Sequence, residues 1–444
     1  MSNLSTAPRV AILTLGCKVN QYESEAIGEA FEAAGFVVCD EGCGCDGYVV
    51  NTCTVTAESD RKARQMIRRL AGKDPAAYIV VTGCSAQANA ATIAAIPGVD
   101  AVIGNRDKLS VVAVMRRLME SGAKPTEPLV EVPSLDGSRF EPMTITRFGR
   151  TRAYVKIEDG CESRCAYCAI PAARGPIRSK PIAEVLTEVE GLVARGCREI
   201  VLTGIETGAW GRDLGTLRLE DLLAEVDAID GIGRVRLGSL DPTVMTEAFV
   251  ARLATLSHVA PHFHLSMQSG CSATLARMRR RYNARQAEAA MARVRAAIPS
   301  VRFTTDIIVG FPGETDEEFA ETVAFTRRAE FLHMHVFPYS RRAGTPAAVM
   351  PGQVPDAVKR ERVRQLTAIS AESCTSILDG VLAAGTPLSV LPETRGEGYV
   401  LGHTPHFMDV RVEGVGDLPD GELAVLPVRR EGEVLVCRAI GATE

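Results

Sequence analysis

The sequence lacks any long uninterrupted apolar run. No stretch of its 444 residues approaches the roughly 18 apolar residues that a membrane-spanning helix needs. Residues 1–17 contain one arginine and a single short apolar run broken by Gly16, so we expect no secretory leader. These absences argue against a protein with helical membrane spans and favour a cytoplasmic location.

The expected cytoplasmic location also excludes a framework of disulfide bonds, although the chain has 13 cysteines. Such frameworks occur in short secreted domains that fold in oxidising compartments, and not in long cytosolic chains. Metal binding or catalysis is therefore the leading explanation for so many thiols.

The chain also has no excess of positive charge. Its formal net charge is -5, whereas binding of nucleic acid by overall charge needs Lys and Arg to neutralise phosphates. Basic residues nevertheless gather locally at 61–69, 277–281 and 341–342. Each cluster is either a solvated surface or a phosphate contact.

What is present is the composition of a globular protein, with 46% hydrophobic and 24% charged residues. In the first hundred residues, β-type runs alternate with amphipathic helical patterns, which predicts a small parallel α/β sheet. Those runs are 10–15, 47–51, 77–82 and 101–104. Cys17, Cys53 and Cys84 each follow one of them. Because the carboxyl ends of parallel strands share one edge, we expect the three thiols to converge.

The rest of the chain divides into further units. Residues 120–146 are rich in Pro, Gly and Ser, which predicts a linker. Between 152 and 340, six β-type runs alternate with helical stretches, which predicts a parallel part-barrel, short of the eight units of a full barrel. A helix around 355–380 leads into a small all-β domain. The expected domains are 7–119 (α/β), 120–146 (linker), 147–377 (partial (β/α)6 barrel) and 378–444 (all-β).

The stretch GCESRCAYCAIP places Cys161, Cys165 and Cys168 directly after the first strand of this part-barrel. That is the rim where parallel barrels carry their chemistry. The spacing supplies three ligands, one fewer than a structural zinc site or a ferredoxin-type cluster uses. A 4Fe-4S cluster with three cysteines leaves one iron free to bind a small molecule. Zinc and inert packed thiols stay open as alternatives.

This spacing resembles the signature of radical S-adenosylmethionine enzymes, and residues 147–375 resemble the core of that superfamily. The whole chain resembles the methylthiotransferase family, whose members carry a second cluster in an amino-terminal domain. The motifs that carry the likeness are TLGCKVNQYESE, VVNTCTVTAESDRKARQ and VVTGCSAQ, followed by LTGIETGAWG, RLGSLDP, HLSMQSGCSATLARMRRRY, TTDIIVGFPGETDEEF and FPYSRRAGTPAA. The carboxyl-terminal segment resembles the TRAM domain, an RNA-binding module.

Within that family, GCKVN resembles the branch that modifies threonylcarbamoyladenosine at tRNA position 37. GCQMN is typical of the isopentenyladenosine branch, and GCPKN of the branch that modifies a ribosomal protein. The resemblance therefore implies a tRNA-modifying enzyme that adds a methylthio group to carbon 2 of that adenine.

The resemblance implies two 4Fe-4S clusters and S-adenosylmethionine as cofactors. Cys161, Cys165 and Cys168 would hold the cluster that binds and cleaves S-adenosylmethionine. The other cluster, which would hold the sulfur to be methylated and delivered, would be bound by Cys17, Cys53 and Cys84. Further cofactor contacts are expected from Gly204, Gln268, Ser269 and Gly310.

The expected partners are the anticodon loop of a tRNA, an electron donor such as a flavodoxin or ferredoxin, and a sulfur source. The basic helix after Cys53 is the expected phosphate contact, through Arg61, Lys62, Arg64, Arg68 and Arg69. From residue 385 onward the chain has five Arg, no Lys and ten acidic residues, so this tail would contribute shape and a few contacts rather than charge. The candidates for those contacts are Arg395, His403, His406 and Arg411.

Three alternatives remain open. In the first, the methylthio group goes to isopentenyladenosine tRNA or to a ribosomal protein. In the second, the protein is a non-catalytic iron-sulfur carrier. In the third, it is an RNA-binding protein with zinc at both cysteine sets. Cys39, Cys43 and Cys45 look like a further metal site, but they lie in a turn before a strand and the family pattern does not require them. We therefore interpret them as ordinary thiols.

Overall fold

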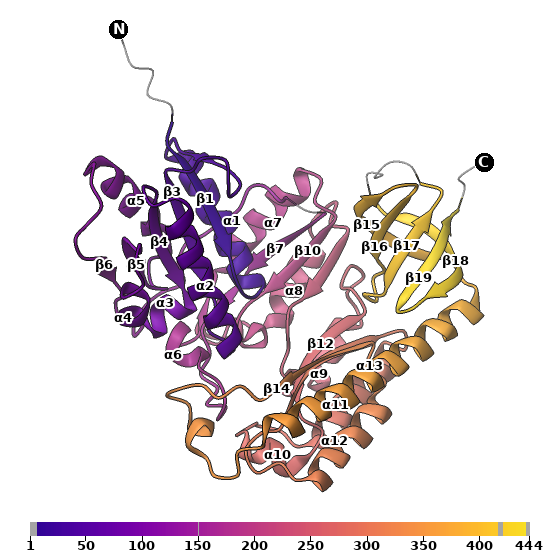
Figure 1. Ribbon diagram of the computed structural model, residues 1–444. Coiled ribbons are helices and arrows are strands. Elements are labelled where there is room, and N and C mark those ends of the chain that lie inside the picture. The colour runs from indigo at the N-terminus through magenta and orange to yellow at the C-terminus, as the bar shows by residue number, and fades with distance from the viewer. Residues whose placement is uncertain (1–6, 150, 416–420, 441–444) are drawn as a thin grey trace.

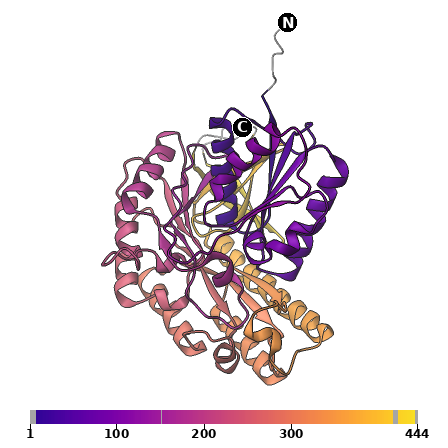
Figure 2. The same cartoon turned by 90° about the vertical axis from the view of Figure 1, so that its left-hand side faces the viewer.

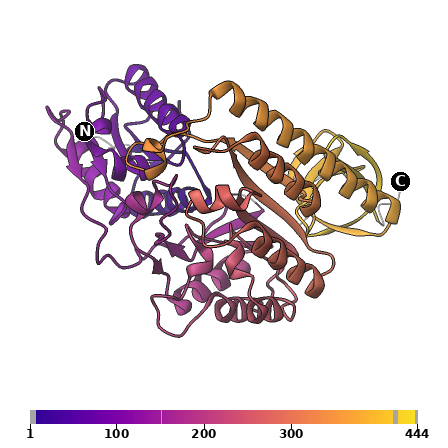
Figure 3. The same cartoon turned by 90° about the horizontal axis from the view of Figure 1, so that it is seen from below.

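The computed structural model describes residues 7–149, 151–415 and 421–440. It shows an amino-terminal α/β unit and a small β-barrel at opposite ends of a central unit (Figures 1 and 3). In the described ranges, no helix combines the length and the apolar character needed to cross a bilayer. The predicted mixed architecture of α/β sheet, part-barrel and all-β tail is confirmed.

The amino-terminal unit is a parallel sheet of six strands in the order β2-β1-β3-β4-β5-β6. Its central strands are buried on both faces, because α1 and α5 cover one face and α2 and α4 the other. The elements are β1 (Arg9–Thr14), α1 (Lys18–Ala33), β2 (Val37–Val38), β3 (Gly47–Thr52), α2 (Ala57–Lys73), β4 (Tyr78–Gly83), α3 (Cys84–Ala88), α4 (Ala90–Ala94), β5 (Ala101–Ile103), α5 (Val111–Glu120) and β6 (Leu129–Glu131).

The segment 120–146 does more than connect two domains. Its strand β6 pairs in parallel with β5 and extends the amino-terminal sheet. Farther along, Met143 and Ile145 are buried in the core of the central unit. The Pro- and Gly-rich composition indicated the turns of this segment, but it hid the short apolar runs that anchor it at both ends.

The central unit holds six parallel strands in two sheets of three, β11-β10-β7 and β12-β13-β14. A bridge between Leu240 and Leu265 helps to join the sheets into an open barrel, with the helices on its outer side (Figure 2). The elements are β7 (Arg152–Lys156), β8 (Glu158–Asp159), α6 (Ile170–Arg174), β9 (Arg178–Ser179), α7 (Ile182–Ala194), β10 (Glu199–Thr203), α8 (Leu219–Asp227), β11 (Arg234–Leu237), α9 (Glu247–Leu253), β12 (His262–Gln268), α10 (Ser272–Arg277), α11 (Ala284–Ala297), β13 (Arg302–Val309), α12 (Asp316–Ala329) and β14 (His333–Pro338).

The tail begins with the 29-residue helix α13 (Asp356–Ala384), which runs through the expected domain boundary at 377/378. It leads into a closed barrel of five strands in the order β15-β16-β17-β19-β18. These strands are β15 (Leu388–Gly396), β16 (Tyr399–His403), β17 (Asp409–Glu413), β18 (Leu423–Glu431) and β19 (Val434–Ala439).

The tail barrel docks on the amino ends of the central strands. The ring of Phe407 lies between those of His262 and His403, with both centroid distances 4.8 Å. Arg236, on β11, donates to the Pro405 carbonyl oxygen at 3.2 Å. The tail therefore lies at the end of the central barrel opposite the carboxyl ends of its strands.

The surroundings of three of the tail residues expected to contact RNA are set within the protein. His403 lies between Glu393 and Asp409, with N–O distances of 2.6 and 2.7 Å. Arg411 is paired with Glu413 at 2.8 Å. Burial, followed by nearby arginine charges, lowers the pKa of His406 to about 4. The interface with the central unit and the acids of the tail engage these side chains, which sequence alone presented as available.

Candidate active site at two sets of cysteines

The loop between β8 and α6 carries Cys161, Cys165 and Cys168 at the carboxyl ends of the central strands, as predicted. Gly160 begins the loop with φ +95°, and a Cβ there would lie 1.9 Å from the Pro176 carbonyl oxygen, so only glycine fits. All three thiols are half-buried. They are therefore held by protein and still reachable by a ligand.

Two charged side chains reach this loop. Glu206 Oε2 lies 3.0 Å from Cys161 Sγ, and Arg280 Nη1 lies 3.3 Å from Cys165 Sγ. Burial, followed by the hydrogen bond to Glu206, raises the pKa of the Cys161 thiol, and burial raises the pKa of Cys168 to about 11. A metal that binds these sulfurs must displace their protons, as at any thiolate site.

Gly204, one of the expected cofactor residues, lies after β10 against the buried side chain of Glu158. A Cβ at position 204 would lie 2.7 Å from Glu158 Oε2. That oxygen accepts a hydrogen bond from the Glu206 amide at 2.7 Å, while Glu158 Oε1 has no hydrogen-bond partner among the described residues. Glu158 Oε1 is therefore a buried polar atom without a partner in the described ranges, and burial raises the pKa of this carboxyl well above its usual range.

The other three expected cofactor residues lie at the carboxyl ends of β12 and β13. Gln268 is half-buried and takes φ +65°, which is uncommon for a residue other than glycine. The buried Ser269 hydroxyl lies 3.2 Å from Thr322 Oγ1. The amide of Gly310 donates to Glu314 Oε1 at 2.9 Å. Ser269 and Gly310 thus already have partners within the protein.

Cys17, Cys53 and Cys84 converge at the carboxyl edge of the amino-terminal sheet. They follow β1, β3 and β4, which are adjacent in the sheet order. Gly16 takes φ +115°, and a Cβ there would lie 3.1 Å from Cys53 Sγ. Burial, followed by the charge of Cys84 and that of Cys17, raises the pKa of Cys53 to about 11. Cys17 is exposed whereas the other two are buried, so the set opens on one side.

Each set offers three thiols. Three thiolates can each bind one iron of a 4Fe-4S cluster and leave the fourth iron open to another ligand.

Arg174, in α6 just after the 161–168 loop, reaches the other set of cysteines. Its side chain is fully buried, and its Nε lies 3.0 Å from Cys84 Sγ. Its Nη2 donates to Asn20 Oδ1 at 2.7 Å, and its Nη1 donates to Glu23 Oε1 at 2.5 Å. Cys84 also acts on Cys168 electrostatically. The two sets of thiols therefore adjoin one common region.

Glu23 is the centre of a buried charge network between the amino-terminal and central units. Lys156 donates to its carboxylate at 2.8 Å, Arg174 at 2.5 Å, and Lys108 forms a further ion pair with it. Burial alone would raise the pKa of Glu23, but the charges of these three cations hold it well below its usual range. The carboxylate is therefore ionised and holds α1 against β7 and α6.

Sequence reasoning missed Arg174, Glu206 and Arg280. Glu206 lies within the motif LTGIETGAWG, and Arg280 lies in the basic run 277–281. Arg174 follows the cysteine loop by six positions. Each residue lies in or near a motif that the sequence analysis singled out. Only the fold, however, shows which sulfur its charged group reaches.

The basic residues of α2 divide into two groups. Arg61 pairs with Glu58 at 2.6 Å, and Arg69 pairs with Glu41 at 2.5 Å. In the parts of the chain that the structure covers, no ion-pair partner is found for the other three, Lys62, Arg64 and Arg68.

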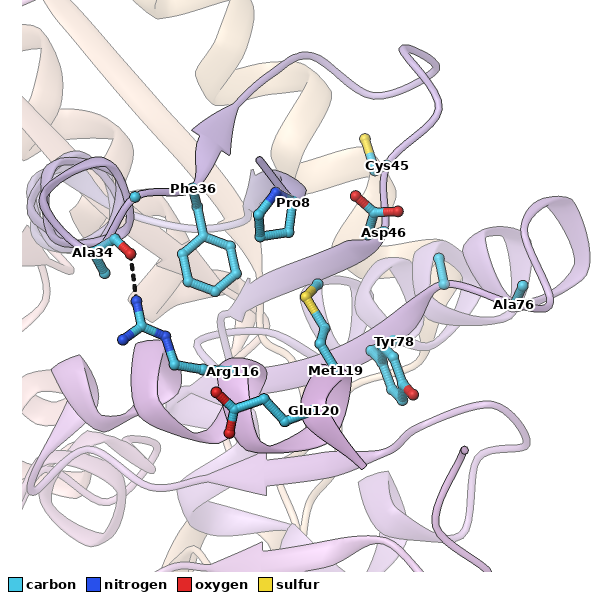
Figure 4. Close-up of a pocket in the computed structure, with 12 residues that line it drawn as sticks. Pro8, Ala34, Phe36, Cys45, Asp46, Ala76, Tyr78, Arg116, Met119 and Glu120 are labelled. Atoms are coloured by element: carbon cyan, nitrogen blue, oxygen red, sulfur yellow. Dashed lines mark hydrogen bonds between the residues drawn. The ribbon is translucent and has the colours of Figure 1, made fainter. Parts of the chain in front are cut away.

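Two further features lie away from this site. The pocket of Figure 4 is lined by Pro8, Asp46 and Tyr78, at the amino ends of β1, β3 and β4, which is the sheet edge opposite Cys17. Near that edge, Cys39 and Cys45 lie with their Sγ atoms 3.3 Å apart, and Cys43 is exposed.

Comparisons with known proteins agree with this geometry. Residues 9–104 match the family model described as Uncharacterized protein family UPF0004, and residues 155–326 match the Radical SAM superfamily. The second match contains the cysteine loop and implies S-adenosylmethionine and a 4Fe-4S cluster. Among solved structures, the radical S-adenosylmethionine methyltransferase TsrM of Kitasatospora setae has a TM-score of 0.56 at 18% identity, covering 78% of this chain and 77% of that chain. This likeness supports the fold.

Curated relatives cover most of the chain. A threonylcarbamoyladenosine tRNA methylthiotransferase of Bacillus subtilis is 40% identical over 415 residues, which is 92% of this chain and 91% of the relative. One of Thermotoga maritima is 39% identical, with 80% of each chain covered. A tRNA-2-methylthio-N(6)-dimethylallyladenosine synthase of Streptomyces viridosporus is 38% identical over 81% of this chain and 72% of the relative.

Proposed function

Because the chain belongs to the radical S-adenosylmethionine methylthiotransferase family, we propose that it modifies threonylcarbamoyladenosine at position 37 of tRNA. The reaction replaces the hydrogen on carbon 2 of the adenine with a methylthio group. The observation that carries the proposal is the contact of Arg174, six residues after the 161–168 cysteine loop, with Cys84 of the other set, in a chain that matches relatives of this named activity over most of its length.

The residues present suit two clusters with separate tasks. We assign Cys161, Cys165 and Cys168 to the cluster that binds S-adenosylmethionine, and Cys17, Cys53 and Cys84 to a second cluster that carries sulfur. When bound, these groups supply radical chemistry and sulfur that no side chain provides. An electron donor such as a flavodoxin or ferredoxin, and a sulfur source, complete the requirements.

The protein's own contribution is to fix the positions of the groups that would bind at the two sets of cysteines. Arg174 donates toward Cys84 while its other nitrogens are fixed by Asn20 and Glu23, so it positions one set relative to the other. Arg280 approaches Cys165 and is itself held by Asp241 at 2.7 Å. A cationic donor beside a thiolate stabilises its negative charge. Both arginines therefore place a positive charge beside a candidate ligand sulfur.

The inner face of β12, β13 and β14 offers a place for the base. His264 Nε2 lies 3.3 Å from Asp306 Oδ2, and the rings of His264 and His335 are 6.1 Å apart. Phe337 lies on the same face of β14 as His335, two residues on, and its side chain is 42% exposed. A base splayed out of an RNA loop can stack on such a ring and hydrogen-bond to the polar groups beside it.

Lys18 distinguishes the proposed acceptor from an isopentenyl one. It follows Cys17 directly and, among the described residues, has no hydrogen-bond or ion-pair partner. Nearby Arg152 and Arg236 instead share Glu199, with nitrogen–oxygen distances of 3.7 and 2.9 Å. The threonylcarbamoyl group carries a carboxylate, which an isopentenyl group lacks. Lys18 is thus the cation left for that carboxylate.

Lys18→Gln is expected to lower methylthiolation of tRNA by about 10- to 100-fold, mainly through a higher KM, because a charge-assisted hydrogen bond contributes about 1.5–3 kcal/mol. Lys18→Arg should retain most activity. The measurement is steady-state formation of the methylthio nucleoside by liquid chromatography and mass spectrometry. If Lys18 served the adjacent cluster instead, iron content and S-adenosylmethionine cleavage without RNA would fall together with product.

The basic face of α2 is proposed to contact the tRNA backbone close to the second cysteine set. Lys62, Arg64 and Arg68 have no intramolecular ion-pair partners in the described ranges. The segment 378–444 is proposed to be a TRAM-like module, and 7–119 and 147–377 the two cluster-binding domains. Since the tail histidines face the central unit, any RNA contact of the tail must use its outer surface.

Nucleoside analysis of tRNA from a deletion strain tests the function itself. Loss of 2-methylthio-threonylcarbamoyladenosine, with accumulation of the unmethylthiolated nucleoside, is the expected result. Restoration by the wild-type gene, and not by a Cys165→Ala gene, attributes the loss to this chain. Unchanged levels of that nucleoside, with loss of a methylthio group from isopentenyladenosine or from a ribosomal protein, would move the chain to another branch of the family.

A further inference from the structure

A compact group of metal-type ligands lies far from the six cysteines of the active site. It consists of His333, Cys374 and Glu433, whose ligand atoms all lie within 4.8 Å of one another. His333 begins β14, Cys374 lies in α13, and Glu433 lies in the turn between β18 and β19. The group therefore joins the central unit, the connecting helix and the tail barrel.

The spacing suits a single ion. His333 Nδ1 lies 3.6 Å from Glu433 Oε2. Metal–ligand bonds of about 2.0–2.3 Å in a tetrahedral site place neighbouring ligand atoms about 3.3–3.8 Å apart. The outer limit of 4.8 Å exceeds that range by about an ångström, which side-chain rotations can close.

Cys374 differs from an ordinary packed thiol. It is almost fully buried. Burial, together with the charges of Glu433 and Asp409, raises its pKa to about 12. Cys437 lies in the same hydrophobic cluster and is equally buried, but burial alone raises its pKa. Cys374 thus has two acidic neighbours and an imidazole, whereas Cys437 has an apolar setting.

We propose that His333, Cys374 and Glu433 bind a zinc ion, with Asp409 or water as the fourth ligand. One sulfur, one imidazole nitrogen and one carboxylate oxygen form a mixed set that zinc accepts readily. The thiolate disfavours magnesium and calcium, which prefer oxygen ligands. Bound zinc would neutralise the carboxylate and the thiolate and fasten the tail barrel to α13 and β14.

The test uses the full chain, purified without oxygen and with its clusters in place, then dialysed against buffered free zinc. Mass spectrometry of metals should find about one zinc ion per chain in the wild type. Zinc X-ray absorption should show one sulfur and otherwise nitrogen or oxygen neighbours. Cys374→Ala should lose the zinc, and Cys437→Ala, the matched control, should keep it; iron content should be the same in all three.

A gentler variant guards against a folding defect in Cys374→Ala. Glu433 lies in the turn between β18 and β19. The substitution Glu433→Gln should weaken zinc binding more than tenfold in a chelator competition. It should leave the circular dichroism of the zinc-free protein unchanged. Equal zinc content in wild type and Cys374→Ala, an absorption spectrum with three sulfurs, or unaltered affinity in Glu433→Gln would overturn the proposal.

Discussion

Cys165→Ala is expected to abolish the cleavage of S-adenosylmethionine, reducing formation of 5'-deoxyadenosine to background. Cys165 is one of three proposed cluster ligands on a single loop, and its sulfur lies 3.3 Å from Arg280 Nη1. Removing it leaves two thiolates, which is too few to hold a cluster that keeps one iron open. The measurement is the yield of 5'-deoxyadenosine from reconstituted, chemically reduced protein.

Cys271→Ala is a suitable control, because Cys271 is a buried free cysteine outside both sets. It should retain its iron and its cleavage activity. Because Cys165 is only half-buried, its truncation should leave the fold intact, which circular dichroism can verify. Cleavage that survives in Cys165→Ala would show that this loop does not hold the reacting cofactor, and would restore the non-catalytic carrier as an explanation.

Cys53→Ala is expected to separate the two halves of the reaction. It should still cleave S-adenosylmethionine, because the loop at 161–168 is untouched, but it should form no methylthio nucleoside. Iron content should fall from about eight to about four atoms per chain. Cys53 is a better choice than Cys84, whose sulfur also receives Arg174 at 3.0 Å, so that a loss there would confound ligation with positioning.

The measurement combines iron and sulfide analysis with detection of both products in one reaction. Cys45→Ala is the control within the same domain, since Cys45 lies toward the opposite edge of the sheet. Wild-type methylthiolation by Cys53→Ala would remove this cysteine from the sulfur-carrying site. Loss of cleavage as well would mean that the two sets of thiols are not separable in function.

Much of this site can be predicted from the sequence. The carboxyl ends of parallel strands lie at one edge of a sheet, so residues that follow such strands come together even when they are far apart in the chain. The sequence therefore predicts that Cys17, Cys53 and Cys84 converge, and the sheet places them after three adjacent strands. The set at Cys161 was easier to predict, because its three candidate ligands lie within eight residues of the sequence. The six strands of the central unit could also be predicted, because each is a short β-type run, apolar or alternating, and most are separated by helical stretches.

The remaining features depend on packing between distant segments, for which the sequence has no periodic signal. The contact of Arg174 with Cys84 spans 90 positions. The strand β6 is only three residues long, so its apolar pattern is too brief to stand out in a Pro-rich stretch. His403, a candidate RNA contact, has Glu393 and Asp409 as neighbours, and these reach it only through the pairing of strands in the closed barrel.

The buried carboxylate of Glu23 has a consequence for how this protein can change over generations. Its three cations belong to different segments: Lys108 to the amino-terminal unit, and Lys156 and Arg174 to the central one. An exchange of residues 7–119 for a segment without an acid at position 23 would leave Lys156 and Arg174 buried without this carboxylate, at a cost of several kcal/mol. Chimaeras should therefore fold only when the residues at positions 23, 156 and 174 still combine an acid with two cations.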